Sequence, residues 1–124
     1  MKELFLIRGL PGSGKTTFAH KITDHVCEAD QFFAQSGEYK WDREQLPHAH
    51  NWCRKRVQHL MNFGVSTIAV ANTFVTRDTM DPYIAIAKVY GYTVTEITMS
   101  GPLRESIHNV PAENIDRMNQ QWEK

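Results

Sequence analysis

The chain has 124 residues, enough for one compact domain with its own hydrophobic core but too few for two. Its 14 basic and 14 acidic residues cancel, so no overall field attracts nucleic acid or an anionic membrane, and such a partner must bind a local patch. Two cysteines form no disulfide framework and no apolar run could span a bilayer, so we expect a cytoplasmic protein with no membrane partner.

A phosphate-binding motif lies near the beginning of the sequence. Residues 4–7 form a continuous apolar run, which predicts a parallel strand buried on both faces. Residues 9–16 then read G-L-P-G-S-G-K-T and match the pattern G-x-x-x-x-G-K-[ST] at every fixed position. A helix with its apolar side toward a sheet is expected over residues 15–25. Strand, loop and helix in this order predict a nucleotide-binding site.

The residue types in this loop suit an anion. Gly9, Gly12 and Gly14 allow positive φ angles and a close approach of the backbone to phosphate oxygens. Loop N–H groups at a helix N-terminus then form a concave anion site. Lys15 is predicted to contact the β- and γ-phosphates, and the Thr16 hydroxyl to hold Mg²⁺. The predicted nucleotide-binding residues are Gly9, Pro11, Gly12, Ser13, Gly14, Lys15, Thr16 and Thr17.

After the first helix, strands are expected to alternate with helices. The further strands are predicted over residues 27–29, 65–71 and 92–99. The further helices are predicted over about residues 43–62, 77–90 and 109–123, with a loop or small hairpin over residues 34–43. Gly64 and Gly91 end two of these helices, and Pro111 suits the first turn of the last. The order predicts an α/β fold: a doubly wound parallel sheet of the P-loop NTPase type, flanked by helices, as a single domain over residues 1–124.

Polar residues follow the expected strands, at the edge where such sheets bind their ligands. Asp30 follows the second strand, and Asn72 and Thr73 follow the third. A carboxylate at this edge could accept a proton from a hydroxyl that attacks the γ-phosphate, or could help to hold the metal. Aspartate is also common as a turn or helix cap, so the pattern alone leaves both the functional and the capping interpretation of Asp30 open.

The histidines and one basic run give weaker signals. His48 and His50 are two residues apart, and no Cys/His set has zinc-ligand spacing, so no zinc site is predicted. Residues 54–56, Arg-Lys-Arg, could contact a nucleic-acid backbone, but such a run is more often a solvated helix face.

The motifs together resemble those of the polynucleotide-kinase-like P-loop phosphotransferases. The resemblance rests on the phosphate loop followed by "EADQFF", "GEYKWD", "AHNWC", "ANTF", "MDPYIAIAKVYGY" and "IHNVPAENIDRM", and it covers residues 4–123. The aspartate after the second strand and the "HxVP" before the last helix are its most specific parts. This family includes phage polynucleotide 5′-hydroxyl kinases and small stand-alone proteins, and a phage member would act in the host cytoplasm.

The resemblance implies transfer of the γ-phosphate of ATP to a hydroxyl, often the 5′-hydroxyl of DNA or RNA, with Mg²⁺ as cofactor. Lys15 and Thr16 match the phosphate and metal ligands, and Asp30 matches the general base and is our candidate second metal ligand. We assign Asn72, Thr73 and Arg77 to the substrate. The sequence does not distinguish ATP from GTP.

The sequence departs from the family pattern at three places. Ala71 and Phe74 stand where many members have aspartate and asparagine. Glu105 stands where polynucleotide kinases place a lid arginine, and Arg104, one residue away, is our candidate to replace it in catalysis. An arginine finger contributes a factor of about 10³–10⁵ in rate in related enzymes. Two functions therefore stay open: an ATP-dependent kinase acting on a hydroxyl, and a nucleotide-binding module acting through a protein partner.

Overall fold

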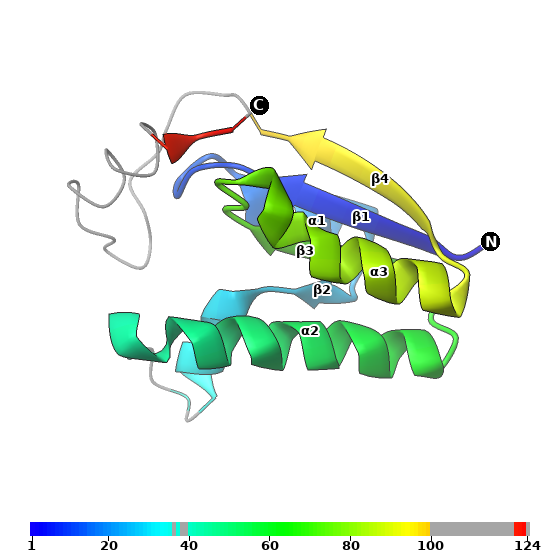
Figure 1. Ribbon diagram of the computed structural model, residues 1–124, viewed down its shortest axis with the longest axis horizontal. Helices are drawn as coiled ribbons and strands as arrows, with labels where there is room; N and C mark the ends of the chain where they lie inside the picture. The colour runs from blue at the N-terminus through cyan, green and yellow to red at the C-terminus, as the bar shows by residue number, and fades with distance from the viewer. Residues whose placement is uncertain (36, 38–39, 100–120, 124) are drawn as a thin grey trace.

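A four-stranded parallel sheet forms the centre of the computed structural model, which describes residues 1–35, 37, 40–99 and 121–123 (Figure 1). Its strands are β1 (Glu3–Arg8), β2 (Val26–Cys27), β3 (Thr67–Asn72) and β4 (Thr93–Thr98). They lie in the order β2-β3-β1-β4, and every pairing is parallel. The predicted α/β fold with a doubly wound parallel sheet is therefore confirmed.

Helices cover both faces of this sheet. The α-helices are α1 (Lys15–Ile22), α2 (Leu46–Asn62) and α3 (Asp81–Tyr90), and the short 3₁₀ helices are η1 (Ala29–Ala34), η2 (Arg43–Gln45) and η3 (Arg77–Met80). In Figure 1, α1 lies behind the sheet and α3 in front of it, while α2 runs along the bottom of the view beside β2. None of the helices in the described ranges has the length and apolar character needed to cross a bilayer.

Alternating residues of the central strands build two cores. Leu4 and Leu6 of β1 belong to the larger core, which also holds the buried faces of α2 and α3. Ile7 belongs to the smaller core, which holds Ala19 of α1. Because successive side chains of a strand point to opposite faces, a strand covered on both sides must be apolar throughout. This is why the run at residues 4–7 correctly predicted a central strand.

Several element boundaries differ from the predictions. The first helix ends at Ile22, because the Thr23 hydroxyl donates to the Thr67 carbonyl at 2.9 Å and directs the chain into β2. The second strand stops at Cys27, because Glu28 already caps η1. The helices predicted from residues 43 and 77 each begin as a short 3₁₀ turn before a proline in the first turn of the α-helix. The helix predicted over residues 109–123 lies outside the described residues except for 121–123.

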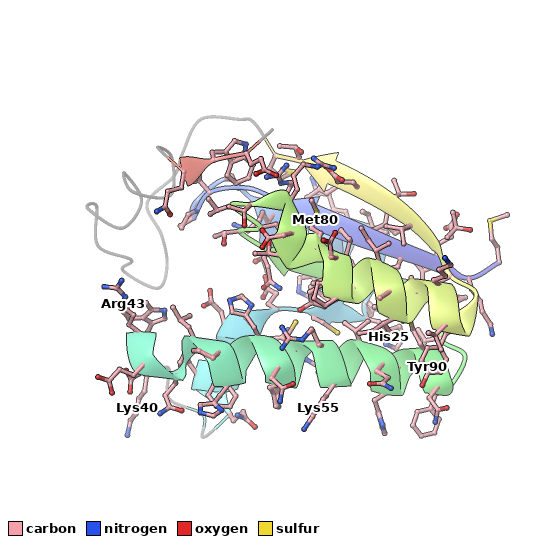
Figure 2. The ribbon with its side chains drawn as sticks, in the orientation of Figure 1. His25, Lys40, Arg43, Lys55, Met80 and Tyr90 are labelled. Carbon is pink, nitrogen blue, oxygen red and sulfur yellow. The ribbon has the colours of Figure 1, made fainter. Side chains whose placement is uncertain are left out.

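The basic run lies on α2. Figure 2 shows the Lys55 side chain projecting from this helix away from the sheet. Arg56 is also exposed, with its guanidinium carbon 5.6 Å from the centre of the Trp52 ring. Lys55 thus lies on a solvated face of α2, whereas the Arg56 guanidinium also donates to Gln31 Oε1 of η1.

Candidate functional site

The phosphate loop joins β1 to α1 at the carboxyl edge of the sheet. Gly12 and Gly14 have φ angles of 83° and 89°, in the left-handed region that favours glycine. Gly14 is also the N-cap of α1, and its carbonyl accepts the Phe18 N–H at 3.0 Å, which starts the helix directly behind the loop. The free N–H groups of the first helical turn are therefore available to an anion at this edge.

Gly9 has a different role from the one predicted. Its φ is not positive, so the prediction of a left-handed conformation there was wrong. What Gly9 provides is space, since a Cβ atom would lie 2.4 Å from Ser13 Oγ and 3.1 Å from Met99 Cβ. The loop therefore packs directly on the end of β1.

The other loop residues surround this contact. Ser13 is only 8% exposed, and its hydroxyl has no hydrogen-bond partner among the described residues. Its N–H donates to the Leu10 carbonyl at 3.1 Å. Pro11 is half-buried and Thr17 is exposed on the first turn of α1. The nucleotide-binding roles assigned to these residues remain predictions.

Lys15 points back into the loop. Its Nζ donates to the Leu10 carbonyl at 3.1 Å. Burial lowers the pKa of Lys15 to about 8, and the carboxylates of Glu28 and Asp30 oppose this shift. The ammonium group therefore lies within electrostatic reach of both acidic residues that follow β2.

Glu28 is a site residue that the sequence analysis missed. The Thr16 hydroxyl donates to Glu28 Oε1, and the Glu28 N–H donates to Gln31 Oε1 at 3.2 Å as part of a capping box on η1. Burial raises the pKa of Glu28, the charge on Asp30 adds to this rise, and the Thr16 hydrogen bond opposes it. Its position in "EADQFF", two residues before Asp30, was the available signal.

Asn72 fixes the turn that carries Asp30. Asp30 lies half-buried in the first turn of η1. The Ala29 N–H, immediately before it, donates to Asn72 Oδ1 at 2.9 Å, and Asn72 Nδ2 donates to Cys53 Sγ at 3.8 Å. Asn72 is 7% exposed, so its amide groups serve the protein's own backbone and core. A substrate contact by this residue remains a prediction.

The remaining substrate and catalytic candidates are less centrally placed. The Thr73 carbonyl accepts the Gly9 N–H at 3.3 Å, which joins β3 to the phosphate loop. Arg77 is exposed and forms two hydrogen bonds to Glu96 of β4, at 2.9 and 2.6 Å. Its guanidinium is thus directed toward β4. Arg104 lies outside the described residues.

A histidine from α2 also lies close to the acidic turn. Burial lowers the pKa of His50, the charge on Arg54 lowers it further, and the charge on Asp30 raises it. His50 is therefore near enough to Asp30 for their charges to interact. Across the described ranges, no three His, Cys, Asp or Glu side chains gather closely enough to hold a metal ion.

The phosphate loop after β1, the strand order and the polar residues at the carboxyl edge define a P-loop kinase-like domain. Comparison with known proteins agrees: the family model for the AAA domain matches residues 4–124, and the chain belongs to this family. The resemblance drawn from the motifs is confirmed at the level of a P-loop kinase-like domain.

Proteins similar to this chain differ from it in length. The chain is 29% identical to NEDD4-binding protein 2 of Homo sapiens over 98% of its own length, and it spans 8% of that protein. A chain of the Pnkp1/Rnl/Hen1 RNA repair complex superimposes with a TM-score of 0.68 at 16% identity, covering 97% of this chain and 43% of that one. Kti12 of Chaetomium thermophilum in complex with ADP-AlF3 gives a TM-score of 0.65 at 13% identity, covering 98% and 80%. These structural likenesses establish the fold.

Proposed function

We propose that this chain binds ATP in its phosphate loop and transfers the γ-phosphate to a hydroxyl group. The P-loop kinase fold supports a nucleotide-binding, phosphotransferase-type function. One observation carries the proposal further: Asp30 lies within electrostatic reach of Lys15 at the carboxyl edge of the sheet. A carboxylate beside the phosphate-binding lysine is where a general base for an attacking hydroxyl is needed.

Each group has a defined task in this proposal. The loop N–H groups and Lys15 bind the phosphate chain and stabilise the charge that develops on it. Asp30 accepts the proton of the acceptor hydroxyl. The oxygen of that hydroxyl bonds to the γ-phosphorus, and the bond from the phosphorus to the ADP oxygen breaks. The hydrogen bond from Ala29 to Asn72 keeps the turn that carries Asp30 in place during this step.

The donor atoms around Thr16 suit Mg²⁺. This ion prefers hard oxygen ligands and is usually held by one or two carboxylates together with substrate phosphates. The Thr16 hydroxyl donates to the Glu28 carboxylate, and Asp30 lies near enough for its charge to act on that carboxylate. Thr16 and Asp30, with Glu28 beside them, are thus the residues that would hold Mg²⁺. When bound, the ion would neutralise charge on the β- and γ-phosphates.

The acceptor that we propose first is the 5′-hydroxyl of a polynucleotide. The fold is shared with a chain of an RNA repair complex, and the motif order resembles that of polynucleotide kinases. The neutral overall charge favours a short strand or an end over a long duplex, because a long polyanion is bound through many phosphate contacts. Arg104 is proposed as the arginine that contacts the transferred phosphoryl group.

Transfer of labelled phosphate tests this function. The protein is incubated with Mg²⁺ and γ-labelled ATP against 5′-hydroxyl DNA, 5′-hydroxyl RNA and a panel of small hydroxyl compounds. Asp30→Asn keeps the size of the side chain and should lower kcat by about 10²–10⁴-fold, while ATP binding stays within a few-fold. Asp24→Asn is the matched control, because Asp24 is exposed and lies before β2, at the opposite edge of the sheet.

The variants separate the two functions left open by the sequence. Label on one acceptor class, lost in Asp30→Asn and kept in Asp24→Asn, would establish a kinase and its substrate class. ATP binding that requires Lys15, with no transfer to any acceptor, would overturn phosphotransfer and favour a nucleotide-binding module that acts through a protein partner.

A further inference from the structure

Arg8 is the last residue of β1 and directly precedes the phosphate loop. Its side chain is 1% exposed, although arginine is almost never fully buried unless its charge has partners. Burial lowers the pKa of Arg8, the carboxylates of Glu96 and Glu123 oppose this shift, and the neighbouring Arg77 adds to it. A buried guanidinium of this kind requires hydrogen-bond acceptors on several sides.

Backbone carbonyl groups supply most of these acceptors. Arg8 Nε and one terminal nitrogen donate to the Phe74 carbonyl at 3.1 and 2.8 Å. The same terminal nitrogen reaches the Val75 carbonyl at 3.3 Å and also donates to the Glu123 carbonyl. The other terminal nitrogen lies 3.9 Å from Glu96 Oε1. Arg8 therefore joins the loop after β3 to a segment 115 positions away in the sequence.

The segment of residues 121–123 closes over this guanidinium. The Trp122 ring lies against it, with the guanidinium carbon 4.2 Å from the ring centre, which is cation–π geometry. The Glu123 N–H donates to the Val75 carbonyl at 2.8 Å, and the Glu123 carboxylate accepts the Arg77 N–H at 3.1 Å. Figure 1 shows this segment in red, near the end of β1 from which the phosphate loop starts.

Backbone hydrogen bonds link Arg8 to the phosphate loop. Its carbonyl accepts the Met99 N–H at 2.8 Å, and the N–H of the next residue, Gly9, donates to the Thr73 carbonyl at 3.3 Å. A Cβ atom at Gly9 would lie 2.4 Å from Ser13 Oγ and 3.3 Å from Lys15 Cγ, so the Gly9 backbone packs closely against side chains of the phosphate loop. A displacement of Arg8 would therefore displace the loop residues that are proposed to hold the nucleotide phosphates.

We propose that Arg8 is a positioning residue for nucleotide binding, and that Trp122 and Glu123 complete its surroundings. The guanidinium fixes the first turn of the phosphate loop against the loop after β3 and against residues 122–123. Nucleotide affinity then depends on side chains far along the chain that are themselves not assigned to the nucleotide. This inference rests on the nucleotide binding proposed above.

Lysine at position 8 is the informative substitution. It keeps the positive charge but cannot donate to three carbonyl groups through a planar fork. We expect Arg8→Lys to raise the Kd for ATP by about tenfold at a temperature where thermal unfolding shows a folded protein. Lys88→Arg is the control, because it makes the reverse exchange at an exposed side chain in the last turn of α3, and the Kd should not change.

Tryptophan emission provides a second readout that a purely structural role would not change. The part of the ATP-induced emission change that disappears in Trp122→Phe belongs to Trp122. We expect the unchanged protein to show this Trp122 contribution and Arg8→Lys to lack it. Trp122→Phe should itself retain its affinity for ATP, because a ring still covers the guanidinium.

The outcomes separate this proposal from the proposed function. ATP binding by the unchanged protein that is lost in Lys15→Ala confirms the nucleotide site. If the unchanged protein binds no ATP, both proposals fall. If it binds ATP and a folded Arg8→Lys binds equally tightly, or if ATP leaves the Trp122 emission unchanged, only the positioning role of Arg8 is overturned.

Discussion

Raising the pH from 7 to 9.5 is expected to weaken ATP binding through Lys15. Burial in the phosphate loop lowers the pKa of this ammonium group to about 8, from an ordinary value of 10.5. Below pH 8 the group is charged and attracts the phosphates. Above pH 8 the free protein loses this proton, whereas bound phosphates would favour keeping it, so binding must then be accompanied by proton uptake.

The size of the effect follows from the pKa. About half of Lys15 is protonated at pH 8 and about a tenth at pH 9, so the Kd for ATP rises by about fivefold, or ~1 kcal/mol, between these two pH values. This window lies well above the second pKa of a phosphate group, about 6, so the charge of ATP itself does not change. Folding stability should change in the opposite direction. Between pH 8 and 10.5 the unfolded chain binds more protons at Lys15 than the folded chain does. The contribution of Lys15 to the free energy of unfolding therefore increases with pH in this range.

Titration calorimetry measures both parts of this prediction. The Kd for ATP is determined from pH 7 to 9.5 in buffers of different ionisation enthalpy, which report the protons taken up on binding. Lys15→Met is the control, and its weaker affinity should be nearly independent of pH. A constant Kd up to pH 9.5, without proton uptake above pH 8, would refute the placement of a partly desolvated lysine at the phosphates.

Three further substitutions test particular contacts. Gly9→Ala should weaken ATP binding, because the new Cβ falls 2.4 Å from Ser13 Oγ, and adding Ser13→Ala should restore part of the affinity measured by calorimetry. Phe74 has a φ of 47°, so Phe74→Gly should unfold in denaturant with a free energy about 1 kcal/mol higher than Phe74→Ala, the reverse of the order expected in a strand. Equal stabilities would remove the argument for strain at this position. Glu28→Gln should shift the weakening of ATP binding to lower pH, because the Glu28 carboxylate raises the pKa of Lys15, and Glu44→Gln, on the exposed η2, should not.

Phe74 also explains one departure of this sequence from the family pattern. Asparagine, found there in many members, adopts the left-handed region readily, whereas phenylalanine does so only under strain. The ring of Phe74 is buried and packs edge-on against Tyr83, with ring centres 5.6 Å apart. Two hydrogen bonds from Arg8 to its carbonyl hold the strained backbone. Packing and Arg8 thus maintain a conformation that asparagine would adopt by itself.

What the sequence revealed was local. The phosphate loop follows from consecutive residues, and the central strands follow from apolar runs that sheet burial requires. The contact between Ala29 and Asn72 could not be read in this way, because it joins residues 43 positions apart and exists only because β2 pairs with β3. Glu28 was missed for a related reason: the strand was expected to continue through it, whereas it caps a 3₁₀ turn.

Arg8 was overlooked because the apolar run that predicted the first strand ends at residue 7, one position before it. The sequence places it beside Gly9, but its partners come from residues 74, 75, 96, 122 and 123. These positions meet only once the β2-β3-β1-β4 order is established. A motif search is therefore a poor guide to the groups that support a motif from elsewhere in the chain.

The distribution of cations at the carboxyl edge leads to a last prediction. Phosphoryl transfer requires positive charge on the transferring group in addition to the phosphate-loop lysine. In the described part of the chain, Arg8 is committed to carbonyl groups and Arg77 to Glu96, so neither guanidinium is directed at the nucleotide. If the chain is a kinase, Arg104 remains the candidate that the sequence offers for this role. Arg104→Ala should then lower kcat by about 10³-fold with little change in the Kd for ATP, whereas Arg77→Ala should leave kcat within a few-fold. Full activity in Arg104→Ala would place the second positive charge on another group, either elsewhere on this chain or on a partner.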